Sequence, residues 1–459
     1  MSQSKELGRE PIGRLLVKMA VPAALGILVL SINFIVDTIF VGRFVGTLAI
    51  AAITVVMPIS FLISSAGMAI GVGGASVISR ALGGDDLAKA NRTFGNMATM
   101  TLILACSLLF VCVLFKEEVL VLYGGKGDIL APAATFFNIV LMSVPALAWA
   151  MMSNNVMRAE GRPKMAMYTM MIPSVVNLIL DPVLILGLDM GLRGAAWATT
   201  LSYFCSAGFA IWYFFPGPSE LKIKWINLPL KKQLVREISS IGSVTLARQG
   251  AVSLFMIVLN HSLFNQGGEL AVAIFGVINR VLMFANFPVL GITQGFLPIA
   301  GYNYGAEKYD RVKAVIRVSI LSGTLISLGL LLSILFFAEP IVSLFTTDPK
   351  LLAPTPRALK IVFMAIPLIT AQLVGSAYFQ AIGKALPALL LTMTKQGFFL
   401  IPLVLIMPPF FEDGLDGIWY AFPLADVLAA TVTLLYLFRE VRKRLNPAIE
   451  LQSRAEVIE

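Results

Sequence analysis

Two aspartates lie within long apolar stretches of the sequence. Asp37 sits in SINFIVDTIFVG, and Asp181 sits in VVNLILDPVLILG. An ionised carboxylate at the centre of a bilayer costs about 3 kcal/mol or more, so such residues normally face inward and serve a function. Carboxylates in this setting bind protons, Na⁺ or organic cations. The two residues therefore predict a cation-binding site at bilayer depth.

Polar residues with helical spacing accompany both aspartates. Asn177 precedes Asp181 by one helical turn, and Asn33 precedes Asp37 by one turn, so each pair shares a helix face. Pro182 follows Asp181, removes a backbone hydrogen bond and is expected to bend the helix. The alternative interpretation is that these groups only hydrogen-bond to each other and hold the helices together.

Further candidates lie on the neighbouring helices. Thr199 lies in the middle of the sixth predicted span, and Asn154 lies near the end of the fourth. Met151 and Met152 adjoin Asn154 and are expected in the substrate cavity, because flexible methionine side chains suit a promiscuous site. Pro22 gives the first span an expected bending point.

The composition places these residues in a membrane protein. The chain has 459 residues, of which 58% are hydrophobic and 13% charged, and its mean hydropathy is +0.86. Soluble domains carry about 25% charged residues, and a membrane-spanning helix needs about 20 apolar residues. We predict an all-α membrane protein with spans at 14–42, 47–79, 93–115, 129–157, 165–187, 194–215, 234–264, 269–303, 311–337, 352–382, 386–409 and 417–438.

The basic residues alternate between connections. Lys and Arg gather in the even-numbered connections and the C-terminal tail, whereas the odd-numbered connections carry few of them. This asymmetry predicts that both termini are cytoplasmic. It also explains the net charge of +9 without a nucleic-acid partner. The three cysteines and the one histidine lack metal-binding spacing, so we expect no metal centre and no cofactor.

The sequence contains an internal repeat. RAEGRPKMA (158–166) corresponds to QAIGKALPA (380–388), and GTLAIAAI (46–53) corresponds to GELAVAIF (268–275). We predict an N-lobe at 1–216, a cytoplasmic loop at 217–233, a C-lobe at 234–445 and a cytoplasmic tail at 446–459. Each lobe contains six spans, so the two lobes run parallel, related by a pseudo-twofold axis along the membrane normal.

The repeat makes the aspartates more informative, because neither acid recurs at the equivalent position of the second half. The second half instead carries Arg248, Arg280 and Lys395 within or near its spans. We expect these cations to be paired or to bind backbone carbonyls. The alternative is a positive wall that repels cationic compounds or holds an anion.

At these residues the chain resembles the multidrug and toxic compound extrusion (MATE) family of drug/cation antiporters. The resemblance rests on VDTIFVGR, NLILDP, RAEGRPK, NYGAEKYDRVK and QAIGKALP, in this order and spacing. It implies a V-shaped pair of lobes around a central cavity, with alternating access driven by H⁺ or Na⁺. It identifies the following residues with cation coupling or, for the proline, with bending: Asp37, Asn177, Asp181, Thr199, Asn154 and Pro22.

One branch of that family places acids in the C-lobe to bind Na⁺. The seventh and tenth spans here carry Arg248 and Gln372 but no acid, so we expect these residues to line the cavity and coupling to occur in the N-lobe. The resemblance implies a transporter that exports small organic cations or drugs in exchange for H⁺. We expect it in the inner (cytoplasmic) membrane of a prokaryote, as a monomer. Na⁺ binding at Asp37 and Asp181 stays open, as does a lipid-linked or polysaccharide precursor flippase of the same superfamily. The sequence contains no HExxH, GxSxG or Walker motif, so an enzyme is not expected.

Overall fold

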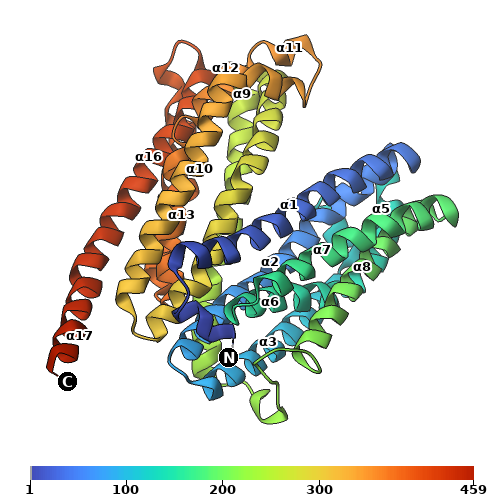
Figure 1. The fold of residues 1–459 in the computed structure, drawn as a ribbon. Coiled ribbons are helices and arrows are strands. Elements are labelled where there is room, and N and C mark those ends of the chain that lie inside the picture. Colours follow the sequence, from blue (N-terminus) through green and yellow to red (C-terminus); the bar gives the residue numbers. More distant parts are fainter. Residues whose placement is uncertain (1–2, 459) are drawn as a thin grey trace. The chain divides into compact units, whose positions relative to one another are not determined.

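The computed structural model describes residues 3–458, and every regular element in that range is a helix (Figure 1). The described chain packs as two compact units. The first contains Leu25–Thr245 and the N-terminal segment that precedes Gly8. The second contains Gly8–Ala24 and the chain from Leu246 onward.

These units differ from the lobes expected from the repeat at two places. Residues 8–24, the start of the expected N-lobe, pack with the second unit. Residues 217–245, which include the linker and the start of the seventh span, pack with the first unit. The helices α1 (Ile12–Phe44) and α9 (Lys232–Gly305) therefore contribute to both units.

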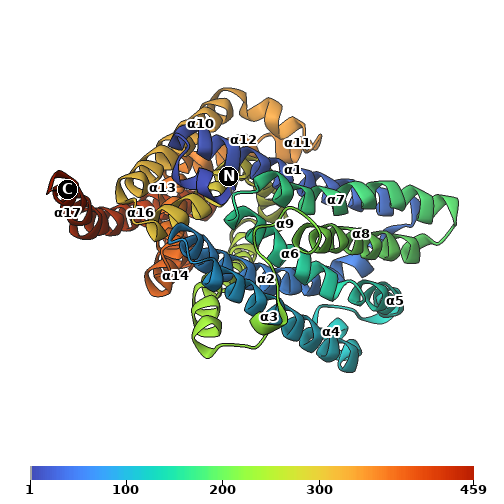
Figure 2. The same ribbon diagram turned by 60° about the horizontal axis from the view of Figure 1, so that its bottom comes forward.

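The first unit contains the parts of α1 and α7 that carry Asp37 and Asp181, and Figure 2 shows α7 beside α8. Besides the second part of α1, its elements are η1 (Gln3–Gly8, whose last residue belongs to the second unit), α2 (Thr47–Gly83), α3 (Leu87–Leu114), α4 (Lys116–Leu122), η2 (Gly127–Ile129), α5 (Leu130–Leu141), α6 (Val144–Ala159), α7 (Pro163–Pro182), η3 (Val183–Gly187), α8 (Gly191–Phe214) and η4 (Trp225–Asn227). Small residues allow α2 and α6 to pack closely. A Cβ added at Gly67 would lie 2.9 Å from the carbonyl oxygen of Ala148.

The second unit repeats this arrangement. Besides residues 246–305 of α9, its elements are α10 (Tyr309–Ser343), α11 (Pro349–Leu352), α12 (Thr355–Phe363), α13 (Ile366–Ala381), α14 (Ala385–Met393), η5 (Thr394–Leu400), α15 (Ile401–Ile406), η6 (Pro408–Phe410), α16 (Gly414–Glu440), η7 (Val441–Leu445) and α17 (Asn446–Ile458). The expected tail at 446–459 is helical over its described part.

The backbone confirms the all-helical membrane fold. Eight described helices are long and apolar enough to span a membrane, and two bent helix pairs raise the number to ten. The helix α9 is two helices joined at Gly268, and α8 is 24 residues long. Counting α9 as two and adding α8 gives a helix for each of the twelve expected spans.

The repeat is visible in the backbone as well as in the sequence. The two bent pairs, Gly127–Leu141 with Val144–Ala159 and Pro349–Phe363 with Ile366–Ala381, bend by 54° and 45°. Three positions with positive φ, a region that favours glycine, recur at equivalent sites. These pairs are Gly46 and Gly268 (φ 112° and 62°), Asp85 and Glu307 (54° and 57°), and Gly161 and Gly383 (76° and 83°).

Candidate cation site between helices of the first unit

The first unit contains a cavity of about 180 Å³ between α1, α2, α5, α6, α7 and α8. Most of its lining is apolar, which matches its position between membrane-spanning helices. Polar groups that line it include Asn33, Asp37, Ser64, Asn177, Thr199 and Tyr203. Four of the residues expected at the site therefore meet in one cavity, although they come from three helices far apart in the sequence.

A chain of amide hydrogen bonds connects α1 with α7. The Asn33 Nδ2 donates to Asn177 Oδ1 at 3.1 Å, and Asn177 Nδ2 donates to Asp181 Oδ1 at 3.3 Å. Asn177 and Asp181 are buried, with 4% and 3% of their surfaces exposed. Asp181 lies beside the cavity and is connected to it through Asn177. The one-turn spacing on α7 thus produces the shared face that the sequence predicts.

The carboxyl groups of Asp37 and Asp181 lie close enough to interact electrostatically. The Asp37 Oδ1 atom is buried and has no hydrogen-bond partner among the described residues. The described lining of the cavity includes neither Lys nor Arg. Two carboxylates about 4 Å apart repel by roughly 4 kcal/mol at an effective dielectric of 20. A shared proton or a bound cation removes this repulsion, so the pair has the chemistry of a cation site.

The helix that carries Asp181 changes geometry directly after it. Pro182 ends α7, and the next residues form the π-helical turn η3 at Val183–Gly187. A proline has no N–H for the i→i−4 ladder, and π-helical turns are frequent at functional sites. The irregularity after Pro182 is therefore a change of helix type next to the carboxyl pair, and α7 with η3 remains one continuous span.

The remaining N-lobe candidates do not line this cavity. Asn154 is buried in α6, and its Nδ2 donates to the Ala166 carbonyl at 2.5 Å and to Thr169 Oγ1 at 2.8 Å. Met152 is fully buried where α6 packs against Gly71 of α2, and Met151 packs against the core of the same unit. In this conformation Asn154 links α6 to α7, and the two methionines contribute to the packing of α6 within the unit.

The candidate residues of the second unit lie on three different helices, α13, α9 and α1. Gln372 is buried in α13, and its Nε2 donates to the Leu391 carbonyl of α14 at 3.0 Å. Arg248 is half-buried on α9. Pro22 lies inside the continuous helix α1, two residues before its packing changes from the second unit to the first.

One buried acid of the second unit was missed by sequence reasoning. Asp426 of α16 is 4% exposed, and its Oδ1 lies 2.5 Å from Nζ of Lys395 in the π-helical turn η5. The signal was present, because Asp426 is a single acid in the apolar stretch AFPLADVLAA. Lys395 therefore has the acidic partner expected for a basic residue at depth, whereas Arg248 and Arg280 form no ion pair or side-chain hydrogen bond with any described residue.

Comparisons with known proteins support the architecture described above. A family model described as MatE matches the chain twice, at residues 22–183 and 245–406. The two matches coincide with the internal repeat. Together they cover more than half of the chain.

Similar proteins share nearly the whole length. The multidrug export protein MepA of Staphylococcus aureus (strain MSSA476) is 27% identical over 434 residues, covering 94% of this chain and 95% of MepA. A crystal structure of MATE in the bent conformation is 24% identical with a TM-score of 0.91, covering 98% of this chain and 99% of that one.

A transporter of the MOP superfamily from Pyrococcus furiosus, whose binding pocket is described as having reverse polarity, is also 24% identical. Its TM-score is 0.88, and the comparison covers 96% of this chain and 98% of that one. These likenesses establish the fold. The double family match, the twelve helices and the repeated backbone features together show that the chain belongs to the MatE family of multi-pass membrane transporters, and it is not an enzyme.

Proposed function

We propose that this chain is a multidrug efflux antiporter that exports lipophilic, mostly cationic compounds in exchange for protons. MepA, which is similar over nearly the whole length, is named as a multidrug export protein. The observation that carries the coupling proposal is the carboxyl pair of Asp37 and Asp181, with one buried oxygen that has no partner among the described residues.

The contrast with the second unit supports an N-lobe coupling site. Asp426 is compensated by the ammonium group of Lys395 at 2.5 Å. Asp37 and Asp181 have amide neighbours, and no basic side chain lines their cavity among the described residues. A compensated carboxylate has little need for a further cation. An uncompensated pair favours a proton or another cation strongly.

The pair provides a mechanism for exchange. When it is at least partly ionised, it attracts a lipophilic cation by an interaction of roughly 4 kcal/mol at 4 Å and an effective dielectric of 20. Protons that enter from the outside neutralise the carboxyl groups and remove this attraction. The compound then leaves outward, and the protein returns by alternating access. For this exchange, the proton and the compound must favour opposite conformations of the same part of the protein. We propose that this part is the segment of α1 near Pro22.

Transport into vesicles distinguishes H⁺ from Na⁺ coupling. We expect a pH gradient without Na⁺ to drive export of a cationic dye, and a Na⁺ gradient at fixed pH to drive none. The Asp37→Asn variant should lose the pH-driven transport, whereas Glu118→Gln, which changes an exposed acid of α4, should keep it. If a Na⁺ gradient alone drove transport, the coupling ion would be Na⁺ and the proposal of H⁺ coupling would be wrong.

A flippase for lipid-linked precursors is the competing function. It requires basic side chains that are free to hold a phosphate. Of the three basic residues of the second unit, Lys395 is already paired with Asp426, which leaves Arg248 and Arg280 as the candidates for this role. Binding of a lipid diphosphate and of a cationic dye to the purified protein separates the two functions. We expect only the dye to bind competitively with protons.

We further propose that both termini lie in the cytoplasm and that the membrane is the inner (cytoplasmic) membrane of a prokaryote. The concentration of Lys and Arg in the even-numbered connections supports the orientation, and the bacterial source of MepA supports the membrane. A cysteine introduced at Lys224 of the linker should react with an impermeant reagent only from the cytoplasmic side.

A further inference from the structure

A second and larger cavity lies in the first unit. It has a volume of about 970 Å³ and shares no lining residue with the cavity at Asp37. Its walls are one face each of α3, α6 and α8, and its end is formed by the linker that follows α8. The mechanism proposed above does not use this groove.

The groove has the dimensions and surface of a lipid-chain site. Its lining along α8 runs from Phe204 to Phe215, the residue directly after the helix, which is a length of about 16 Å. Half of a hydrocarbon core about 30 Å thick has nearly the same depth. Leu102 and Phe204 on its rim are 60% and 47% exposed on membrane-spanning helices, so the groove is open toward lipid. An apolar hollow in this position is filled by hydrocarbon rather than by water.

The linker closes the groove at the end where α3 begins. Thr99 Oγ1 donates to the Leu228 carbonyl at 2.9 Å, and Asn96 Nδ2 donates to the Asn227 carbonyl at 3.0 Å. The linker therefore runs along α3, as the yellow-green segment of Figure 2 shows. Trp225 of this segment lines the groove while 88% of its surface stays exposed, which is typical of an aromatic residue at a membrane interface.

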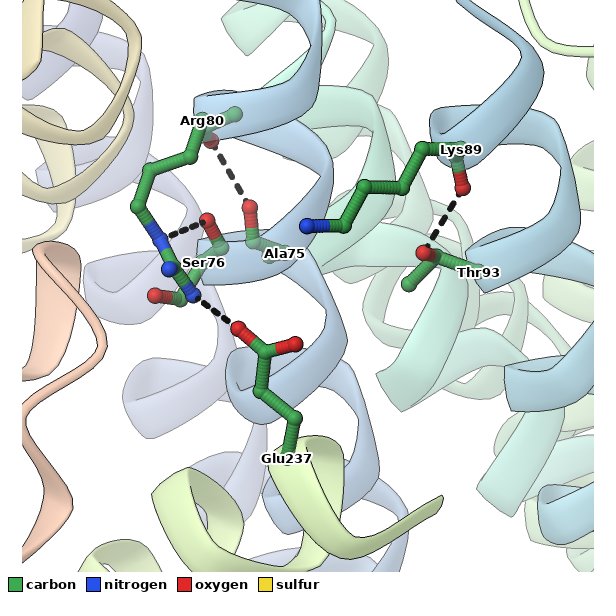
Figure 3. A network of polar contacts seen from close by, with 7 residues as sticks. Ala75, Ser76, Arg80, Lys89, Thr93 and Glu237 are labelled. Atoms are coloured by element: carbon green, nitrogen blue, oxygen red, sulfur yellow. Dashed lines mark hydrogen bonds and ion pairs between the residues drawn. The ribbon is translucent and has the colours of Figure 1, made fainter. Parts of the chain in front are cut away.

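The linker presents positive charge without compensation. Lys224, Lys231 and Lys232 are exposed and form no ion pair with any other described residue. The acids nearest in sequence are engaged elsewhere. Glu220 accepts from Ser4, and Glu237 is held by Arg80 at 2.8 Å (Figure 3). The polar end of the groove is therefore complementary to an anion.

Two buried polar atoms of the groove could bind the region of a lipid that lies between its charged headgroup and its acyl chains. Thr101 is 2% exposed, and its hydroxyl oxygen has no partner among the described residues. The Nε1 of Trp149 is likewise buried and without a partner in that range. Both residues line the groove, and Thr101 is two residues along α3 from Thr99, which holds the linker. Two unused donors at this level fit the ester oxygens of a glycerophospholipid.

We propose that this groove binds one anionic phospholipid from the leaflet on the side of the linker, which the Lys and Arg asymmetry makes the cytoplasmic leaflet. An acyl chain lies between α3 and α8. The ester oxygens accept from Thr101 and Trp149, and the phosphate contacts the exposed lysines of the linker.

Lipid binding to the purified full-length protein tests this site. The first probe is phosphatidylglycerol against phosphatidylcholine, with bound lipid counted by native mass spectrometry. Phosphatidylglycerol should bind more tightly, and Lys224→Gln, Lys231→Gln and Lys232→Gln together should weaken it by about fivefold for each lysine. The matched control removes three exposed lysines outside the groove: Lys126→Gln, Lys350→Gln and Lys360→Gln. Equal binding of the two lipids, or equal losses in the two triple variants, would overturn the proposal.

A second measurement locates the acyl chain. In a background with Trp197, Trp212 and Trp419 changed to Phe, only Trp149 and Trp225 remain of the five tryptophans. Phosphatidylglycerol with brominated chains should quench their fluorescence, and Ala207→Phe, which fills the groove, should abolish the quenching. Thr101→Val, which preserves the side-chain shape, should weaken binding by a few-fold. Displacement by inorganic phosphate alone, or by a cationic dye, would show a different ligand and refute the lipid site.

Discussion

At the scale of single residues, Asp37 and Asp181 could be identified from the sequence because each is an acidic residue within an apolar, membrane-spanning stretch. Asp37 and Asp181 are costly at bilayer depth, and their carboxyl groups interact. The one-turn spacing predicted that Asn177 shares a face with Asp181. Contact of Asn177 with Asn33 could not be predicted, because it depends on which helices are neighbours. Asp426 carried the same signal as the other two acids, and its partner Lys395 lies on another helix.

The buried pair of Lys395 and Asp426 leads to a prediction about stability. Their side chains are 17% and 4% exposed, so removing one charge leaves the other uncompensated. Asp426→Asn should lower the stability by about 3–5 kcal/mol. The double variant Lys395→Met with Asp426→Leu should recover most of this loss. Thermal unfolding in detergent measures both, and a double variant as unstable as the single one would contradict a desolvated ion pair.

At the scale of the elements, the linker between the two halves is fixed by a buried acid. Glu160 follows α6 and is 1% exposed. It accepts from Tyr213 Oη at 2.7 Å, from Ser219 Oγ at 2.6 Å and from the Leu221 amide at 2.9 Å. Burial raises the pKa of the Glu160 carboxyl above its ordinary value, although these hydrogen bonds act in the opposite direction. Sequence reasoning placed a polar loop here and could not identify what holds it.

The raised pKa of Glu160 predicts a pH dependence of stability. The folded protein binds this proton more tightly than the unfolded chain, so the stabilisation is complete below the unfolded pKa and is lost as pH rises through the folded pKa. Glu160→Gln keeps an acceptor for Ser219 and removes the titration. We expect its melting temperature to fall less than that of the parent between pH 5 and pH 8. If the melting temperatures of the parent and of Glu160→Gln changed equally with pH over this range, titration of Glu160 would not contribute to the pH dependence of stability.

Bending of helix α1 near Pro22 leads to a prediction about the rate of transport. Pro22 removes one backbone hydrogen bond close to the position where α1 passes from one packing unit to the other. Pro22→Ala should restore that bond and straighten or stiffen the helix. Binding of a cationic dye should change little, whereas the rate of dye export should fall by about tenfold or more, the effect expected if bending limits turnover. Unchanged export in vesicles would show that α1 does not need to bend there.

At the scale of the whole molecule, the repeat was the most reliable guide. The recurrence of Gly161 as Gly383 predicted two related halves, and both glycines adopt left-handed backbone at equivalent turns. The double family match covers the same two halves. Packing boundaries were not predictable from hydropathy, because α1 and α9 each contribute to two units. The side chains of Asn154 and Gln372 were likewise not predictable, because their partners depend on the exact packing of adjacent helices.

Substrate-triggered proton release from the purified protein is the most direct test of the central claim. In weakly buffered detergent, a cationic dye should release protons from the parent protein, and Glu118→Gln should release as many. Asp37→Asn and Asp181→Asn should each release far fewer, because one carboxyl alone no longer suffers the repulsion that makes the pair share a proton. Full release from both Asn variants would contradict a coupling site at Asp37 and Asp181.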